Sequence, residues 1–583
     1  MRNTKLLMMA IMAGVCAMSL CGCEKSSETQ ANLCEYLKFD GQGGYAATVL
    51  QGEPVEFKAM TREDGSIFVD IEMLQKYIDD RFYFDKTENY ILFTDATHTI
   101  TSYVGENQYV ERKEKQTVDY TISMLEGDIC YINMEYVKMF CDLNYKLYKA
   151  AGNKPERLVI NDFKPMKYTE AKAKKNNKMR VDMDTMSDIV VEIDKDESLR
   201  IIKEEGEWYS AQTEDGFTGY VQKKYNTAGK KKSINPKNDD ETYTHTVMEE
   251  KVKMVWHQVT NVSANDTLSS MSADMAGVNA ISPTWYTMKD GKGSIVDLSS
   301  SNYVKKAHNM GCKVWPLVDD FSKDSNGNKY VDTVLASTTV REEFEDNLIS
   351  SLLACGADGL NVDFEYISKA YQDDYHQFLR ELSIKCKENS LTLSIDNYVP
   401  TEFSEYYDMK QQGKLADYVM VMSYDEYNSA SDAAGPVASL PFVQKAVSDT
   451  VDLVGDASRV IMGIPFYTRV WTETPEEFAA DGAKIIEDSA NGNYALSSKA
   501  VGMETAKDIC RKAKVTPEWN EEMGCDYAYI ENEHGNTQIW LENAKSIRKK
   551  IDVANEYGIG GCGCWKLGFE TKDIWDVIDS YGR

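Results

Sequence analysis

Residues 358–366 read DGLNVDFEY, and this stretch decides the fold of the C-terminal part of the chain. Side chains alternate between the two faces of a β-strand, so Asn361, Asp363 and Glu365 share one face and the apolar residues between them share the other. In a parallel barrel the outer face of a strand packs against helices and must be apolar, so the polar row faces the interior. Burying an unpaired carboxylate is costly, so the row indicates either a satisfied structural cluster or a functional site. Glu365 comes last, at the C-terminal rim where the active sites of barrel enzymes lie, which favours a functional site.

The sequence around this stretch alternates strand-like and helical runs from about residue 250 to the end, which is typical of βα repeats. The candidate strands are residues 252–259, 280–286, 313–318, 359–365, 391–397, 418–424, 460–465 and 560–565. Eight strands in a segment of this length predict a TIM (β/α)8 barrel over residues 250–583. The stretch between Trp471 and Trp540 is too long for a simple connection. We therefore expect an α+β insertion between strands seven and eight.

Several motifs in this region carry a resemblance to a known family. Residues 358–365 resemble the DxxDxDxE signature of glycoside hydrolase family 18, with Asn361 in place of the middle Asp. That replacement is familiar from the branch that contains spore cortex-lytic and related cell-wall N-acetylglucosaminidases. The other matching motifs, in the family's order, are VWHQ at 255–258, SPTW at 282–285, VWPL at 314–317, YVMVMSYD at 418–425, GIPFYTRVW at 463–471 and GGCGCW at 560–565.

The resemblance implies a retaining mechanism in which the 2-acetamido oxygen of the substrate attacks the anomeric carbon. It implies that Glu365 protonates the leaving oxygen, that Asp363 orients the acetamide N–H, and that Tyr424 binds the acetamide carbonyl. The substrate-binding residues that it implies are Asn361, Asp425, Met422, Tyr467, Arg469, Trp565 and Trp285. Because an amide cannot share a proton with Asp363, Asn361 is expected to weaken the proton relay. No metal or organic cofactor is implied.

The first 23 residues have the build of a secretory signal, with a charged start followed by a short apolar run. The run ends in Cys21-Gly22-Cys23, which resembles a bacterial lipobox. The resemblance implies that Cys23 is lipidated and that the protein is anchored, outside the cytoplasm, to the bacterial cell membrane. An ordinary cleaved signal is the alternative.

Two further modules are expected before the barrel. Residues 33–165 read as an α+β domain with a turn–strand–helix layout at 64–74 that recurs at 127–137, and they resemble the N-terminal domain of copper amine oxidases. They lack the His clustering of a copper site, so no metal is inferred there. Residues 178–225 are all-β and resemble a bacterial SH3-like barrel, which serves either as a wall-binding module or as a spacer. Residues 226–249 read as a solvated linker because they are rich in Lys, Asn, Asp and Ser.

Composition limits the function classes. A net charge of −29 argues against nucleic-acid binding. None of the 13 cysteines stands in a CxxC pair, so a zinc site is not indicated, and buried thiols and disulfides both stay open. We expect a monomer.

Three functions compete at this point. The first is cleavage of peptidoglycan by an N-acetylglucosaminidase. The second is a chitinase or an endo-N-acetylglucosaminidase that acts on N-glycans. The third is a catalytically silent glycan-binding lipoprotein, which the presence of Glu365 disfavours because silent relatives usually lose this residue.

Overall fold

The computed structural model describes residues 26–237, 243–488 and 492–582, so the expected signal peptide with Cys23 lies outside the described residues. The chain divides into two compact units. Of the described residues, one unit contains 26–79 and 124–237, and the other contains 80–123, 243–488 and 492–582. Over the described ranges, no helix combines the length and the apolar character needed to cross a membrane.

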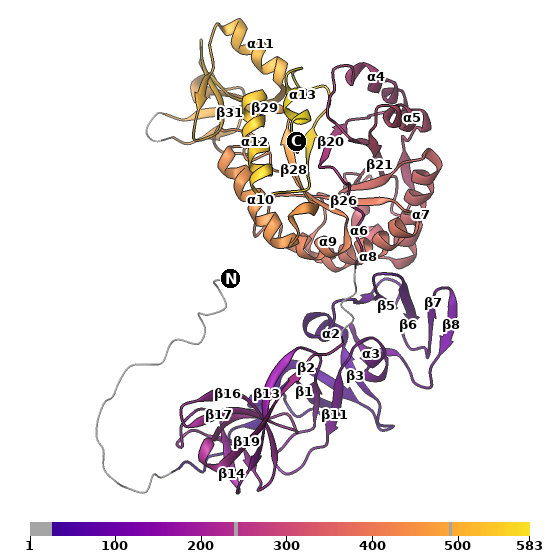
Figure 1. Ribbon diagram of the computed structural model, residues 1–583, viewed down its shortest axis with the longest axis vertical. Coiled ribbons are helices and arrows are strands. Elements are labelled where there is room, and N and C mark those ends of the chain that lie inside the picture. The colour runs from indigo at the N-terminus through magenta and orange to yellow at the C-terminus, as the bar shows by residue number, and fades with distance from the viewer. Residues whose placement is uncertain (1–25, 238–242, 489–491, 583) are drawn as a thin grey trace, which may run out of the picture. The chain divides into compact units, whose positions relative to one another are not determined.

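Eight parallel strands form a closed barrel in the second unit (Figure 1), as the sequence predicts. The strands are β20 (Val252–His257), β21 (Ala280–Met288), β24 (Leu317–Asp319), β25 (Gly359–Asp363), β26 (Thr392–Asn397), β27 (Tyr418–Val421), β28 (Val460–Pro465) and β35 (Gly561–Trp565). Each strand pairs with the next, and β20 pairs with both β21 and β35, which closes the cylinder. A short strand, β23 (Lys313–Val314), precedes β24 and pairs with β21.

Helices surround the barrel and create two cores, one between strands and helices and one inside the cylinder. The main helices are α5 (Ser301–Asn309), α7 (Thr338–Cys355), α8 (Gln372–Glu388), α9 (Met409–Leu415), α10 (Leu440–Val454) and α12 (Ala544–Glu556). Local sequence sets their ends. Helix α7 begins after Ser337, whose side chain accepts a hydrogen bond from the Val340 N–H, and it ends at Gly356 with φ of 79°, a conformation that favours glycine.

The predicted insertion lies between β28 and β35. It is a six-stranded antiparallel sheet covered by one helix, α11 (Met503–Ala513), whose buried side chains pack on the sheet. The strands are β29 (Tyr467–Pro475), β30 (Ile485–Ile486), β31 (Tyr494–Gly502), β32 (Glu518–Asn520), β33 (Cys525–Asn532) and β34 (Gly535–Leu541). Strand β29 follows β28 directly and starts with Tyr467 and Arg469, so the insertion carries two of the predicted site residues.

Residues 80–123 form a five-stranded antiparallel sheet that we call the arm. Its strands are β4 (Phe82–Asp85), β5 (Tyr90–Thr94), β6 (Thr99–Tyr103), β7 (Gln108–Glu111) and β8 (Glu114–Thr117). The sequence predicts that these residues belong to the domain of residues 33–165, whereas in the structure they belong to the same unit as the barrel.

Hydrogen bonds hold the arm against helices α7 and α8. The Tyr83 hydroxyl donates to Asp374, and the Gln377 amide donates to Thr94 over 2.8 Å. The Thr338 N–H at the start of α7 donates to Asp85 over 2.6 Å. These helices precede and follow β25 in the chain, so the arm braces the two helices that flank the strand of the predicted site.

The first unit contains a seven-stranded mixed sheet with order β11-β12-β1-β2-β3-β10-β9. Its elements are β1 (Tyr45–Leu50), β2 (Glu53–Thr61), β3 (Ile67–Asp70), α2 (Ile71–Tyr77), β9 (Ser123–Glu126), β10 (Ile129–Asn133), α3 (Met134–Phe140), β11 (Asn144–Tyr148) and β12 (Arg157–Asn161). A short helix, α1 (Leu33–Tyr36), precedes them. The predicted repeat is present, because β3 and β10 pair and each leads into a helix whose N-cap is Asp70 or Asn133.

The second sheet of this unit is antiparallel throughout, with order β15-β14-β18-β17-β16-β13-β19. Its strands are β13 (Met166–Ala173), β14 (Asn177–Arg180), β15 (Ile189–Ile193), β16 (Ser198–Glu205), β17 (Trp208–Thr213), β18 (Thr218–Gln222) and β19 (Asn226–Ile234). Part of the expected linker 226–249 is therefore a strand. Residues 227–233 are exposed, and β19 is held by backbone pairing with β13. Hydropathy cannot reveal a lysine-rich edge strand of this kind.

Candidate active site

Strand β25 has the two faces that the sequence predicts. Leu360, Val362 and Phe364 lie in the core between strands and helices. Asn361 and Asp363 face the interior, where their side chains are 0% and 7% exposed. The polar row is therefore buried inside the barrel.

Asn361 is the centre of a hydrogen-bond network. Its oxygen accepts hydrogen bonds from the Trp256 indole N–H over 2.9 Å and from the Ser282 hydroxyl over 3.2 Å. Its amide donates to Ser394 over 3.2 Å and to Asp396 over 2.9 Å. These partners fix the orientation of the amide, because the two donors can reach only its oxygen.

Asp363 has fewer hydrogen bonds than Asn361. One of its carboxyl oxygens is buried without a hydrogen-bond partner. Burial raises the pKa of Asp363 well above its ordinary value, and the nearby charges of Asp396 and Glu365 raise it further. The raised pKa marks this carboxyl as a candidate functional group, and its unused oxygen can accept a hydrogen bond from a substrate.

Glu365 lies just beyond the end of β25 and is half-buried. Asp320, which follows β24 and is fully buried, accepts hydrogen bonds from the backbone N–H of Glu365 over 3.0 Å and of Tyr366 over 2.7 Å. Asp320 thereby fixes the backbone that carries Glu365. Burial raises the pKa of Glu365, and the charges of Asp425 and Asp319 act in the same direction, while a hydrogen bond with Tyr398 opposes them. A glutamate with a raised pKa is suited to act as a general acid near neutral pH.

The predicted residues after β27 and β28 meet at the rim. The Tyr467 hydroxyl donates to Asp425 over 2.7 Å, and the Arg469 guanidinium lies 3.8 Å from the same carboxylate. Asp425 is exposed and has φ of 58°, which turns the chain at this point. The ring of Tyr424 stands edge-on to that of Tyr467 at 6.1 Å.

Tyr424 and Met422 lie closer to the polar row. Burial raises the pKa of Tyr424, and the charges of Asp396, Asp363 and Glu365 contribute, so the phenol is electrostatically coupled to the row. A Cβ at position 463 would lie 2.9 Å from the Tyr424 ring, so a glycine at this position makes room for the phenol. Met422 is half-buried and is held through its backbone N–H, which donates to the Asn397 carbonyl over 2.8 Å.

The two predicted tryptophans lie in different places. Trp565, at the end of β35, is half-buried and packs against Trp256 with ring centroids 6.0 Å apart, inside the barrel. Trp285 is 1% exposed, packs on Tyr303 in the outer core and donates its N–H to Asn265 over 2.8 Å. Trp285 is therefore withdrawn as a substrate-binding candidate. Strand β21 has a register irregularity between Thr284 and Tyr286, and the adjacent residues Trp285 and Tyr286 both belong to the outer core.

Four residues of the site were not found from the sequence. They are Asp319 at the end of β24, Asp320 directly after it, Asp396 on β26 and Tyr398 directly after β26. The sequence SIDN at 394–397 carries the signal that could have revealed Asp396, because a second acid on an inward-facing strand position is as costly as the first. Among the described residues, no group of three or more His, Cys, Asp or Glu side chains is arranged to hold a metal ion.

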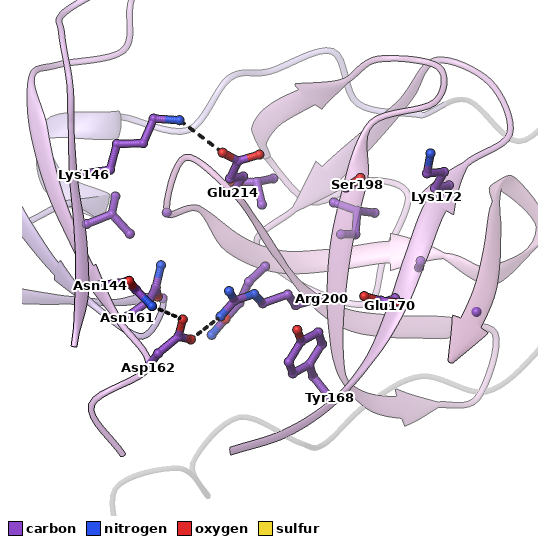
Figure 2. A pocket seen from close by; sticks show the side chains of 18 of the residues that line it. Asn144, Lys146, Asn161, Asp162, Tyr168, Glu170, Lys172, Ser198, Arg200 and Glu214 are labelled. Carbon is purple, nitrogen blue, oxygen red and sulfur yellow. Dashed lines mark hydrogen bonds and ion pairs between the residues drawn. The ribbon is translucent and has the colours of Figure 1, made fainter. Parts of the chain in front are cut away.

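A separate cavity of about 850 Å³ lies in the first unit, between its two sheets (Figure 2). The Arg200 guanidinium donates to Asp162 over 3.0 Å and lies 5.0 Å from the centre of the Tyr168 ring. Lys146 forms an ion pair of 3.1 Å with Glu214 across the cavity. The wall therefore combines aromatic and paired charged groups.

The sequence and the structure were compared with those of known proteins. Residues 285–570 match the family model described as "Glycosyl hydrolases family 18". The uncharacterized glycosylase YvbX of Bacillus subtilis (strain 168) is 25% identical over 313 residues, which cover 52% of this chain and 84% of that protein. The cortical fragment-lytic enzyme of Bacillus anthracis is 23% identical over 265 residues, which cover 43% of this chain and 57% of that protein. The solved spore cortex-lytic enzyme SleL of Bacillus cereus superposes with a TM-score of 0.48 at 19% identity, covering 60% of this chain and 77% of that one.

The family match covers β25 and the rim residues described above. The polar row that ends in Glu365 therefore lies within the matched residues. Residues 285–570 therefore form a glycoside hydrolase family 18 domain, which is the catalytic domain of a glycosidase.

Proposed function

We propose that the protein hydrolyses β-linked glycans that contain N-acetylglucosamine, with peptidoglycan as the first candidate, by a retaining, substrate-assisted mechanism. The observation that carries the proposal is the pairing of a half-buried Glu365, whose pKa is raised, with a buried Asp363 two residues earlier on the same face.

The proposed reaction has two steps. In the first, Glu365 gives its proton to the glycosidic oxygen as the acetamido oxygen bonds to the anomeric carbon and the glycosidic bond breaks. In the second, the Glu365 carboxylate takes a proton from water, whose oxygen bonds to the anomeric carbon and opens the oxazoline ring. Because the anomeric carbon is attacked twice from opposite sides, its configuration is retained.

The other site residues take supporting roles in this proposal. Asp363 accepts the acetamide N–H, and Tyr424 donates to the acetamide carbonyl. Trp565 provides a flat apolar surface for the N-acetyl sugar. The remaining binding residues are Asn361, which holds the network below the sugar, and Met422, Asp425, Tyr467 and Arg469 around the rim.

Relatives named as cortical fragment-lytic enzymes support peptidoglycan as the substrate. Other relatives are named as chitinases, among them probable chitinase 10 of Drosophila melanogaster, and they support chitin-type glycans as the second candidate. The silent glycan-binding alternative is disfavoured by the presence and the environment of Glu365.

The proposal extends to the rest of the chain. A lipid on Cys23 would anchor a monomer to the outer face of the bacterial cell membrane. Residues 178–225, which lie within the second sheet, would be the SH3-like module, and residues 33–165 the module that resembles the copper amine oxidase N-terminal domain. The cavity between the two sheets, with its aromatic and charged wall, is the surface of this unit best suited to contact the cell wall.

The experiment uses the protein without residues 1–23, incubated separately with purified peptidoglycan and with chitooligosaccharides. We expect new reducing ends on at least one substrate, and mass analysis of the products identifies the bond that is cleaved. Glu365→Gln should lower kcat by about 10²–10⁴-fold with the Tm nearly unchanged, because it removes only the proton. Glu388→Gln, an exposed glutamate on α8, is the matched control. A Glu365→Gln variant with wild-type turnover would contradict the assignment of the proton donor.

A further inference from the structure

Because Asn361 replaces the middle acid of the signature, Asp363 lacks a carboxyl beside it on β25 that could donate a hydrogen bond to it. Asp363 has a buried oxygen without a hydrogen-bond partner. Both amide hydrogens of Asn361 are used by Ser394 and Asp396, so Asn361 has no donor left for Asp363.

A second buried acid stands level with Asp363 on the neighbouring strand. The parallel register pairs Asn361 with Ser394 and Val362 with Ile395, so the next position along each strand is Asp363 on β25 and Asp396 on β26. Adjacent strands are about 4.8 Å apart. Asp396 is 3% exposed and faces the interior, because its Oδ1 accepts the hydrogen bond from Asn361.

Asn361 also determines which oxygen of Asp396 can carry a proton. The Trp256 and Ser282 donors fix the amide of Asn361, and its N–H then points at Oδ1 of Asp396. Oδ1 is thus an acceptor, and a proton on Asp396 is placed on Oδ2. Two ionised carboxylates this close in a buried site repel each other, so the pair holds one proton. Burial raises the pKa of Asp396 to about 8 and raises that of Asp363 as well, which agrees with one shared proton near neutral pH.

We propose that Asp396 is a positioning acid that carries this proton and donates it in a hydrogen bond to Asp363, in the place of the missing acid of the signature. Asp363 then stays ionised and correctly turned for the acetamide N–H of the substrate. The proton remains on the pair through the cycle, so the pair keeps a net charge of −1 and neither gains nor loses a proton.

Other titratable groups also face Asp396. From β25 and its end these are Asp363 and Glu365, from α8 it is Tyr375, and from the end of β27 it is Tyr424. All are acids, and no cation is among these groups. Protonation is therefore the way in which the pair lowers its charge.

The inference rests on the proposed function, and two substitutions of similar shape test it. Asparagine at 396 keeps an N–H donor for Asp363, whereas leucine has none. With a nitrophenyl chitobioside as the probe, we expect Asp396→Asn to keep kcat within about fivefold of wild type. We expect Asp396→Leu to lower kcat by about 100-fold with KM changed less than threefold, because the effect falls on the orientation of Asp363.

Two further measurements separate this role from a structural one. In the Asp396→Leu background, Asn361→Asp should restore kcat by at least tenfold, because it returns an acid to the signature position. Infrared spectroscopy should show a protonated-carboxyl band that is lost in Asp396→Asn and that titrates in wild type near pH 8. The folding control is Asn397→Ala, on the same strand as Asp396. It removes the buried hydrogen bond from the Asn397 amide to Gln412 on α9, and it should lower the Tm without changing kcat or the carboxyl band.

The outcomes are distinct. Wild-type kcat in Asp396→Leu, equal loss in the asparagine and leucine variants, or absence of rescue by Asn361→Asp would each overturn the inference. If Glu365→Gln stays active, the proposed function fails first. If Glu365→Gln is inactive while Asp396→Leu is normal, only this inference fails.

Discussion

The contact between the arm and helix α7 gives a prediction whose size follows from the structure. Glu88 accepts hydrogen bonds from the Thr339 N–H over 2.7 Å and from the Ser337 hydroxyl over 3.0 Å. Asp85 accepts the Thr338 N–H in the same turn. Two of the first N–H groups of α7 are therefore capped from a segment about 250 residues away in the chain.

Removing the caps should destabilise the catalytic unit measurably. The loss of one cap costs about 1 kcal/mol, and the loss of a negative charge beside a helix N-terminus costs up to about 1 kcal/mol more. Glu88→Ala should thus cost about 1.5 kcal/mol, and the double variant with Asp85→Ala about 3 kcal/mol. At about 2.1 cal/mol/K per residue of unfolding entropy, a unit of this size loses about 2 °C of Tm in the single variant and about 4 °C in the double.

Differential scanning calorimetry of the protein without residues 1–23 measures these shifts. Hydrogen exchange should quicken at the amides of Thr338 and Thr339 in the double variant, because their acceptors are gone. Glu114→Ala, which removes an exposed carboxylate of the arm on β8, is the control and should change neither readout. If the double variant keeps both the wild-type Tm and the wild-type exchange at the start of α7, the arm does not cap this helix in solution and the reasoning is refuted.

Two further predictions concern the barrel. Trp565→Ala should raise KM for a chitobiose substrate about tenfold. Trp285→Phe should leave KM unchanged and lower the stability by about 1 kcal/mol, because it removes the hydrogen bond to Asn265. A KM effect in Trp285→Phe would show that Trp285 belongs to the site. Burial raises the pKa of Asp320 to about 7 and that of Asp396 to about 8, so the stability that these acids contribute is present at low pH and is lost as pH rises through those values. Asp396→Asn should therefore flatten the fall of Tm toward pH 8, and a curve parallel to wild type would contradict the assigned titration.

The barrel and the centre of its site could be predicted from sequence because they depend on local alternation. The row from Asn361 to Glu365 is visible in nine residues, and the eight strands follow from repeated apolar runs. The prediction for Trp285 was wrong because β21 is irregular between Thr284 and Tyr286, which the sequence motif does not reveal, and the indole packs in the outer core.

The rest depends on contacts between distant residues. Asp320 binds backbone groups 45 and 46 residues later, and the arm binds helices more than 240 residues later. The sequence around these residues shows polar side chains without showing their partners. The lysine-rich strand β19 is held by backbone pairing, which leaves no apolar pattern to read.

The arm also determines which residues a truncated form of the enzyme must contain. A fragment that starts at residue 243 would contain every barrel strand and every site residue, yet it would lack residues 80–123. Arg341 is fully buried and lies 5.2 Å from the Tyr83 ring, so in this fragment its guanidinium would lose that packing partner and become exposed on one side. Exchange of the N-terminal region between related proteins would carry the same cost unless the partner supplied a matching segment, so this stretch and the barrel are expected to be inherited and transplanted together.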